Sequence, residues 1–394
     1  MLSPWRVFWA AFTAGVAATL VQFAVPPVLI LIQVKYQTSY ASNGLLMSVF
    51  AFATILSAVP GGLIVQRYGV RKISLAGLGL MFVGILLSLA TRYFLVFLIG
   101  RLVQGIGFGL TAVAAPSAIG QTMPSKHMDL AMGIWSTWVP LGSLIMFGVG
   151  PSIASHFHMS LYFSGLLLVI GVVAVFQWLF LPRNDVPPTQ QLSRDKTVSR
   201  QFVKSELKNA NVWLLAMIFA SFTFAFFAFN TWITVYLTQS RGLSLTQASR
   251  IPILVSFFVV ISNLCSGWIL KKYRDKIFAY VLPPFLMALI WPTFSFHSIP
   301  VLYMSSVILG LVGGFIPTLV FAKAPALARK SETVGIAMCV IIFGENIGIL
   351  LGPEVFGLLR DYIGNFVVGF WICLLIGLGA VMNISKIARM HRES

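Results

Sequence analysis

Two charged side chains stand deep inside apolar stretches of the sequence, where charge serves chemistry more often than solubility. Arg101 lies in the apolar stretch 93–118, and Glu345 lies near the middle of the stretch 333–357. A charged group in hydrocarbon is costly, so such residues face protein, a wet cavity or a ligand. We predict that Arg101 supplies counter-charge to a solute and that Glu345 carries a proton. The alternatives are a structural ion pair between the two, or a hydrogen bond of Glu345 within the C-terminal half.

Uncharged polar and aromatic groups at similar depth extend this set of candidates. The residues predicted to contact a solute together with Arg101 are Gln22, Gln104, Asn230 and Trp232. A lone Asn or Gln in a membrane helix often joins two helices by hydrogen bonds instead of binding a ligand. Both roles therefore stay open for each of them.

The residue patterns of enzymes are missing from the sequence. It contains no Walker motif, no Gly-x-Ser-x-Gly sequence and no Cys/His cluster, and its three cysteines, Cys265, Cys339 and Cys373, stand inside apolar stretches. We therefore expect no enzymatic activity, no cofactor and no metal site. Without an ATP-binding motif, the energy for any transport would come from a gradient.

The composition indicates which solvent surrounds these candidates. Hydrophobic residues make up 58% of the 394 residues and charged residues 9%, whereas soluble domains carry about a quarter charged residues. Lipid must therefore be the main solvent. The net charge of +17 would suggest nucleic acid in a soluble protein, but here the Lys and Arg residues form short runs between apolar stretches. That pattern is typical of topology signals at a membrane surface, and we expect no nucleic-acid partner.

Twelve apolar segments are separated by polar breaks. A membrane helix needs about 20 apolar residues, and backbone groups in lipid must form hydrogen bonds within their own segment. We therefore predict an all-α integral membrane protein with twelve transmembrane helices. The segments cover about 6–32, 41–65, 73–91, 93–118, 129–155, 159–181, 210–238, 245–270, 277–296, 299–322, 333–357 and 363–385.

The basic residues predict how the chain crosses the membrane. One set of alternate connections, together with both termini, holds 21 Lys and Arg residues, and the other set holds five. The positive-inside rule then places both termini in the cytoplasm of a multi-pass cell-membrane protein. The polar stretch 182–209 reads as a cytoplasmic linker. We predict an N-terminal half over 1–181, a C-terminal half over 210–394 and a monomeric protein.

The two halves repeat each other in sequence. Gly62–Tyr68 matches Gly267–Tyr273 at an offset of 205 residues, and Gly150 with Pro151 matches Gly352 with Pro353 at an offset of 202. Such a parallel repeat predicts two pseudo-symmetric halves of six helices each. A further set of glycines, which would let neighbouring helices approach closely, repeats as Gly105, Gly107 and Gly109 against Gly310 and Gly314.

Two motifs resemble the major facilitator superfamily, and the resemblance covers the whole chain. Arg101 followed by Gln104 and Gly105 is similar to the family's fourth helix. The loop after the second segment is similar to the family's gating loop through Gly62, Arg67, Gly69, Arg71 and Lys72. Gln66 stands where the family has an acid, so it supplies a hydrogen bond but no charge.

The resemblance implies roles that the residues alone do not. In the family this loop latches the cytoplasmic side, which implies gating by Gly62, Gln66, Arg67, Gly69 and Arg71, with a weaker latch because of Gln66. The stretch Ala131–Trp135, with Ala115 and Pro116 before it, is similar to the cyanate and nitroimidazole permease-like branch. The glycine-rich pattern of proton-coupled exporters is only partly present.

These observations predict a secondary active transporter that works by alternating access. The expected substrate is a small anionic or polar organic compound, coupled to protons. One alternative is proton-coupled efflux of lipophilic or cationic drugs, with Glu345 holding the cation. Another is a membrane receptor or scaffold that transports nothing.

Overall fold

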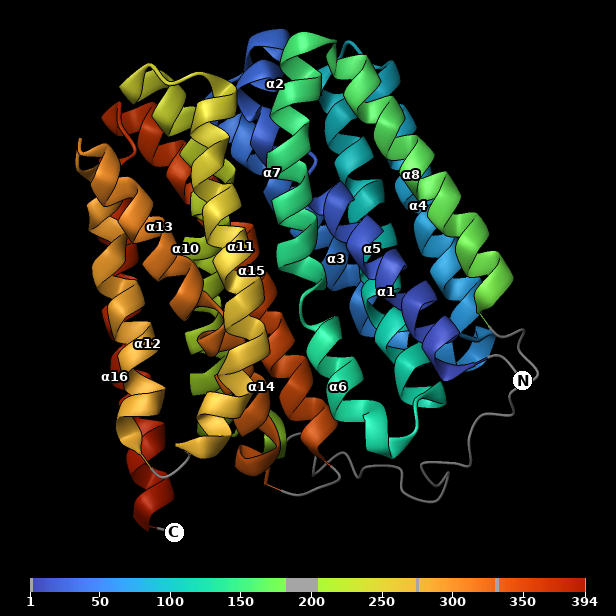
Figure 1. Ribbon diagram of the computed structural model, residues 1–394, viewed down its shortest axis with the longest axis vertical. Coiled ribbons are helices and arrows are strands. Elements are labelled where there is room, and N and C mark those ends of the chain that lie inside the picture. Colours follow the sequence, from blue (N-terminus) through green and yellow to red (C-terminus); the bar gives the residue numbers. More distant parts are fainter. Residues whose placement is uncertain (1–2, 182–204, 274–275, 330–332, 394) are drawn as a thin grey trace. The chain divides into compact units, whose positions relative to one another are not determined.

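The computed structural model describes residues 3–181, 205–273, 276–329 and 333–393. In this part of the chain, twelve spans are long and apolar enough to cross a membrane, and Figure 1 shows that they are all helical. The prediction of an all-α integral membrane fold with twelve transmembrane helices is therefore confirmed.

The first six spans are built from nine helical elements. They are α1 (Pro4–Gln22), η1 (Pro26–Val28), α2 (Leu29–Tyr36), α3 (Tyr40–Tyr68), α4 (Val70–Ala90), α5 (Phe94–Thr122), α6 (Ser125–Trp135), α7 (Trp138–His156) and α8 (Met159–Phe180). The last six spans follow after residue 205. They are formed by α10 (Ala210–Arg241), α11 (Leu245–Lys272), α12 (Ile277–Ile290), η2 (Trp291–Ser295), α13 (Ile299–Gly313), α14 (Phe315–Leu327), α15 (Val334–Ile363) and α16 (Val367–Glu393).

The first span is interrupted, whereas the sequence predicted one helix over 6–32. The chain leaves the α-helix after Gln22, makes a short 3-10 turn at Pro26–Val28 and becomes α-helical again at Leu29. Pro26 and Pro27 explain the break, because proline has no N–H to donate and its ring clashes with the preceding turn. An apolar window cannot detect such a break, because both prolines are themselves apolar.

The described residues form two compact units. One contains residues 3–181 together with Thr231–Ile253, and the other contains 205–230 and the described residues after 253. The first 21 residues of α10 therefore belong to one unit and its remaining residues to the other. The predicted halves 1–181 and 210–394 stay a proposal, because this division cuts α10 and α11 differently.

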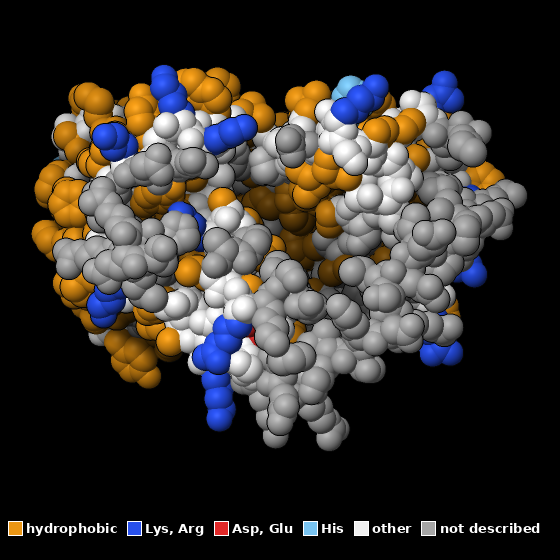
Figure 2. All heavy atoms as spheres, turned by 90° about the horizontal axis from the view of Figure 1, so that it is seen from below, with side chains coloured by type: hydrophobic (Ala, Val, Ile, Leu, Met, Phe, Trp, Pro, Cys, Tyr) orange, Lys and Arg blue, Asp and Glu red, His pale blue; other side chains and the backbone are white. Residues whose placement is uncertain are grey.

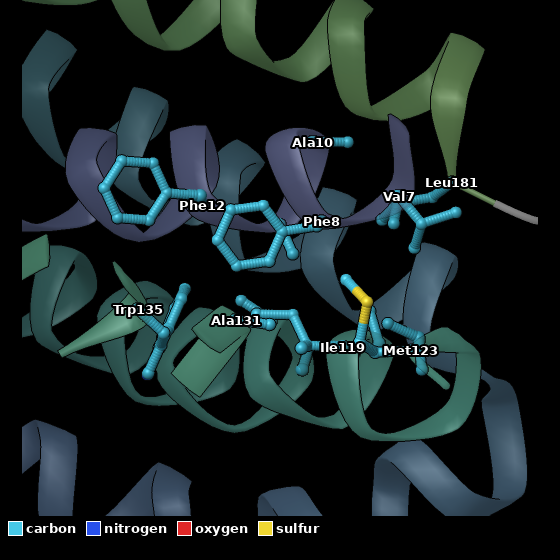
Figure 3. Close-up of a cluster of buried hydrophobic side chains, with 14 of the residues drawn as sticks. Val7, Phe8, Ala10, Phe12, Ile119, Met123, Ala131, Trp135 and Leu181 are labelled. Carbon is cyan, nitrogen blue, oxygen red and sulfur yellow. The ribbon is translucent and has the colours of Figure 1, made fainter. Parts of the chain in front are cut away.

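A cluster of buried apolar side chains joins α1 to α5 and α6 within the first unit. Phe8 and Phe12 from α1 lie against Ile119 from α5 and Trp135 from α6, as Figure 3 shows. Gly15 of α1 has no side chain, and a Cβ there would collide with the Trp135 ring. The cluster fixes one end of the first span, so that its interruption lies at a defined place.

The glycines of α5 allow the close helix contacts that the sequence predicted. A Cβ on Gly105 would collide with the carbonyl of Phe50 on α3, and one on Gly107 with the carbonyl of Gly77 on α4. The α5 backbone therefore lies directly against two neighbouring helices. This contact brings Arg101, one turn before Gly105, within reach of α1 and α3.

Candidate functional site

The interruption of the first span leaves backbone carbonyls deep in the membrane without their usual partners. In a regular helix the N–H groups of residues 26 and 27 would bond to the carbonyls of Gln22 and Phe23, but Pro26 and Pro27 have none. Unpaired carbonyls in hydrocarbon are costly. Side chains from elsewhere in the first unit meet this demand: Tyr162 of α8 donates its hydroxyl to the Ala24 carbonyl at 2.7 Å.

Arg101 of α5 binds the end of α1 directly. Its Nη1 donates to the carbonyl of Val21 at 2.9 Å and its Nη2 to the carbonyl of Gln22 at 3.2 Å. The Gln22 carbonyl is the one that Pro26 deprives of an N–H. The guanidinium therefore replaces the hydrogen bond that the proline removes and holds the broken helix in place.

The remaining donors of Arg101 are also engaged. Nε donates to the Leu46 carbonyl of α3 at 3.1 Å, Nη1 to the side-chain oxygen of Gln104 at 2.8 Å, and Nη2 contacts the sulfur of Met47 at 3.5 Å. The guanidinium also lies 4.4 Å from the centre of the Phe50 ring. An arginine has five N–H groups, and all five have protein acceptors in this structure. None is left for a solute or for a carboxylate partner.

Gln104 supports Arg101, and both polar atoms of its side chain form a hydrogen bond. Its oxygen accepts from Arg101, and its nitrogen donates to the Ser88 hydroxyl at 3.1 Å. The structure thus brings three of the predicted residues together, since Arg101 contacts both Gln104 and the backbone of Gln22. Their polar contacts are built from backbone carbonyls and neutral side chains, and no acidic side chain among the described residues contacts the guanidinium.

Four buried side-chain oxygens lack a hydrogen-bond partner among the described residues: Gln22 Oε1, Asn230 Oδ1, Thr231 Oγ1 and Glu354 Oε2. The exposed fraction of Gln22 is 3%, and Asn230 and Thr231 are fully buried. Asn230 donates its amide to the Phe226 carbonyl at 2.8 Å, so only its oxygen is left over. Because an unpaired buried acceptor is costly, such oxygens are candidates to receive donors from a ligand.

Trp232 lies next to Thr231 on α10. Its side chain is buried, and its ring lies 5.9 Å from the ring of Tyr40 on α3. The Tyr40 hydroxyl also donates to the side-chain oxygen of Gln239 at 2.8 Å, and the Thr234 hydroxyl donates to the Pro26 carbonyl at 3.2 Å. The end of α10 is thereby fastened to α3 and to the interruption of the first span, all within the first unit.

Glu345 lies on α15 in the other unit. A row of glycines, Gly344, Gly348 and Gly352, brings the backbone of α15 against α10. The Thr223 hydroxyl of α10 donates to the backbone carbonyl of Glu345 at 2.7 Å. The carboxylate itself is partly buried and makes no hydrogen bond or ion pair with any described residue. A carboxyl group in this position is available to a proton or to a ligand.

The loop between α3 and α4 is described in part. The surroundings of Gly62 and Gln66 lie outside the described residues. Gly69 joins the two helices with φ 83°, a conformation that favours glycine. Arg67 is exposed and lies over the Tyr68 ring, and Arg71 lies 5.4 Å from the centre of the Trp178 ring on α8.

Comparison with known proteins identifies the family. The family model described as Major Facilitator Superfamily matches residues 7–353 of the chain. The chain belongs to the Major Facilitator Superfamily. Its predicted membership is therefore confirmed, and with it the general role of this family's members, which is transport.

Several superfamily transporters with stated substrates are similar to the chain. The quinolone resistance transporter of Acinetobacter baumannii is 24% identical over 388 residues, covering 90% of this chain and 86% of the relative. The cis,cis-muconate transport protein of Acinetobacter baylyi is 21% identical and covers 86% of this chain and 83% of the relative. A probable anion transporter of Arabidopsis thaliana is 26% identical, but the match covers only 49% of that protein.

The fold is also that of a solved superfamily structure. A bacterial homologue of the human lysosomal transporter Spinster, in its inward-facing and unoccupied conformation, superposes with a TM-score of 0.82. The alignment covers 98% of this chain and 97% of the other at 15% sequence identity. At that identity the likeness shows the fold alone.

Sequence reasoning missed the residues that complete the site around the first span. Tyr162 and Thr234 were not among the predicted residues, although each lies at the interruption or on the adjoining part of α10. The signal that would have pointed to them was the Pro26-Pro27 pair, because a proline pair inside an apolar segment demands side-chain donors elsewhere. These donors are far in sequence from the carbonyls that they bind, so the sequence alone does not show which residues pair.

Proposed function

We propose that this member of the Major Facilitator Superfamily is a proton-coupled secondary transporter of small anionic or polar organic solutes in the cell membrane. The protein works as a monomer with both termini in the cytoplasm. Its halves, 1–181 and 210–394, are joined by the linker 182–209 and expose a binding site alternately to each side. Its partners are the solute, protons and lipid, and it binds no nucleic acid.

The interrupted first span is the observation that carries this proposal. Discontinuous membrane helices are typical of transporter binding sites, because their freed backbone groups and nearby polar side chains offer hydrogen bonds away from water. Here Gln22 presents an unpartnered oxygen at the end of α1. Asn230 and Trp232 on α10 are the further proposed contacts.

Arg101 contributes positive potential to this site. In this structure it makes no free N–H available, so its proposed role is to hold Gln22 and the end of α1 while its charge attracts an anion. Residues 1–181 contain a single acidic residue, Asp129, against eight Lys and Arg residues. This excess of positive charge supports a preference for anionic solutes.

Glu345 is the proposed proton carrier. Its carboxylate has no described partner, and its backbone is fixed through Thr223 to α10. Protonation of this group would therefore change the charge on α15 without breaking an existing ion pair. Ionisable residues inside membrane segments frequently mark proton pathways.

Two finer assignments remain predictions. The end of α3, with Gly62, Gln66 and Arg67, is proposed as a cytoplasmic gate together with Gly69 and with Arg71 at the start of α4. Placement near the cyanate and nitroimidazole permease-like branch is supported only by the stretch Ala131–Trp135 and the preceding Ala115-Pro116 pair.

A second candidate function is efflux of lipophilic or cationic drugs. It is favoured by the similarity to a quinolone resistance transporter, which covers most of both chains. The muconate transport protein and a hexuronate transporter of Bacillus subtilis, which is 24% identical over 67% of this chain, favour the anionic class.

Flux into liposomes separates these possibilities. We expect purified protein to accumulate a labelled dicarboxylate or sugar acid when a proton gradient is applied, and unlabelled anions to compete. Competition by quinolones or quaternary ammonium dyes, without competition by anions, would replace the anionic class by the drug class. Absence of flux for both classes, in vesicles where the protein is shown to be folded, would contradict transport of either class.

A further inference from the structure

A groove opens on the outer surface of the first unit, between the start of α1 and the end of α8. It has a volume of about 430 Å³ and is lined by Arg6 and Trp9 from α1 and by Phe176 and Phe180 from α8. The two phenylalanine rings lie 4.6 Å apart. Trp9 is 47% exposed. The groove therefore combines one guanidinium with three aromatic rings.

The wall behind the groove is held rigidly. Gln177, between Phe176 and Trp178 on α8, is fully buried and donates its amide to the Ala10 carbonyl of α1. Its oxygen accepts from the Ser74 hydroxyl of α4 at 2.7 Å. These bonds tie α8 to both neighbouring helices, so the shape of the groove does not depend on what fills it.

The guanidinium of Arg6 has no partner among the described residues. Residues 1–181 hold eight basic residues, and their single acid is Asp129 on α6, whose side chain lies outside the described part. On the other flank of α8, Arg71 differs from Arg6 because its guanidinium lies over the Trp178 ring. Figure 2 shows the face seen from below, where Lys and Arg side chains are frequent and acidic ones scarce among the described residues. The guanidinium of Arg6 is thus available to bind an anion.

We propose that this groove binds one anionic phospholipid, with the lipid phosphate on Arg6 and an acyl chain along Trp9, Phe176 and Phe180. Basic residues at the cytoplasmic side attract anionic lipids, and aromatic residues are enriched at the boundary between headgroups and hydrocarbon. The charge at Arg6 selects the headgroup, and the rings select a molecule with a hydrocarbon tail. This site is separate from the proposed transport pathway.

The thermal stability of the purified full chain in detergent tests the proposal. Phosphatidylglycerol should raise the melting temperature at lower concentrations than phosphatidylcholine, and inorganic phosphate should raise it little. Arg6→Gln should increase the phosphatidylglycerol concentration needed by about fivefold, the factor expected for one basic residue near a lipid surface. Arg6→Lys should retain most of the preference, because an ammonium also binds phosphate.

Two controls keep the test specific. Lys126→Gln removes the same charge from the exposed start of α6 and should leave the lipid preference unchanged. Brominated phosphatidylglycerol should quench less tryptophan fluorescence in Trp9→Phe than in the wild type. If the Arg6 and Lys126 variants lost the preference for phosphatidylglycerol equally, the preference would come from overall positive charge and not from this groove. A full shift with phosphate alone, or unchanged quenching in Trp9→Phe, would also overturn the proposal.

Discussion

The contact between α1 and α7 and the contact between α10 and α15 use the same device. In the first, the Thr19 hydroxyl donates to the Trp138 carbonyl at 3.0 Å, and Gly142 makes room for Thr19. In the second, the Thr223 hydroxyl donates to the Glu345 carbonyl at 2.7 Å, with Gly348 in the corresponding place. Each threonine thus bonds across a helix pair at a point where a glycine permits close approach.

The helices differ beyond these threonines. Thr19 and Thr223 are 204 residues apart, and the same offset carries Pro26 and Pro27 of the first span to Asn230 and Thr231 of α10. The prolines break the first span, whereas α10 runs without interruption from Ala210 to Arg241. The residues that accept the threonine bonds differ as well, because Trp138 belongs to an aromatic stack and Glu345 carries a carboxylate.

This difference indicates that the two regions have different functions. The region around α1 has a fixed cation, Arg101, whose donors are all engaged, two of them with the end of the broken helix. The region around α10 and α15 has an intact helix, unpartnered polar oxygens and an acid without a described partner. We infer that the first region supplies shape and potential and that the second supplies the group that titrates.

The largest expected effect comes from separating Arg101 from the broken helix. Arg101→Gln removes several hydrogen bonds from a charged donor, each worth about 1.5–3 kcal/mol. It should therefore lower the melting temperature strongly. Pro26→Ala returns an N–H to the Gln22 carbonyl, so Arg101→Gln should be less damaging in that background. Melting curves of the two single variants and the double variant measure this coupling.

Pro27→Ala is the matched control for that cycle. Its restored N–H would face the Phe23 carbonyl, which is not an acceptor of Arg101, so it should show little coupling with Arg101→Gln. Equal coupling for both prolines would mean that Arg101 does not replace a specific missing hydrogen bond.

The glycine contacts should respond differently in the two regions. A Cβ on Gly348 would meet the Ala220 carbonyl as well as Thr223, whereas a Cβ on Gly142 would meet chiefly the Thr19 side chain. Each alanine variant should lose about 1–3 kcal/mol through overpacking. Removing the threonine side chain should rescue Gly142→Ala but not Gly348→Ala, because a backbone carbonyl cannot be trimmed.

Gly148→Ala provides the control on α7, because a Cβ there meets nothing within 4 Å. Its melting temperature should equal that of the wild type. Rescue of Gly348→Ala by Thr223→Ala would show that the two contacts are equivalent after all.

A smaller loss of stability is expected at low pH, and it arises in the second region. Glu206, before α10, is buried and accepts from Thr333 at 2.7 Å, from Asn209 at 2.8 Å and from the backbone N–H of Arg329 at 3.0 Å. Burial by itself would raise the pKa of Glu206, but these hydrogen bonds and the charge of Arg329 together hold it below the usual 4.5. The stabilising contribution is therefore complete above pH 4.5 and is lost as the pH falls through the lowered pKa.

Glu206→Gln should consequently flatten the acid limb of the stability curve. The melting temperature of the wild type should fall more steeply below about pH 4.5 than that of the variant. Parallel curves would show that the Glu206 carboxylate does not link the start of α10 to the start of α15 in the way its hydrogen bonds indicate.

Much of the fold was predictable because lipid restricts the possibilities. Twelve apolar segments of sufficient length and a charge-poor composition leave little besides a helical membrane protein, and the glycines of α5 foretold its close contacts. The arrangement around Arg101 was not predictable in the same way. Its backbone acceptors belong to residues 55–80 positions away, and carbonyls have no signature in the side-chain sequence.

The same reasoning explains what was seen and missed at the candidate site. The depth of Glu345 followed from its apolar segment, but its lack of a described partner depends on which side chains reach α15. Gln22 was selected for its polarity, but that its side-chain oxygen has no described partner is visible only in the three-dimensional contacts. Side-chain type therefore predicted candidates, and only the three-dimensional contacts distinguish engaged groups from available ones.

Measurement of proton coupling in liposomes tests most directly the claim that Glu345 in the second region is the group that titrates. Glu345→Gln mimics the protonated acid, so it should abolish proton-driven accumulation while solute-for-solute exchange continues at a rate near that of the wild type. Glu354→Gln, the same change on the same helix, should retain both activities. Full proton-driven accumulation by Glu345→Gln, or an equal loss in Glu354→Gln, would contradict the assignment of proton chemistry to Glu345.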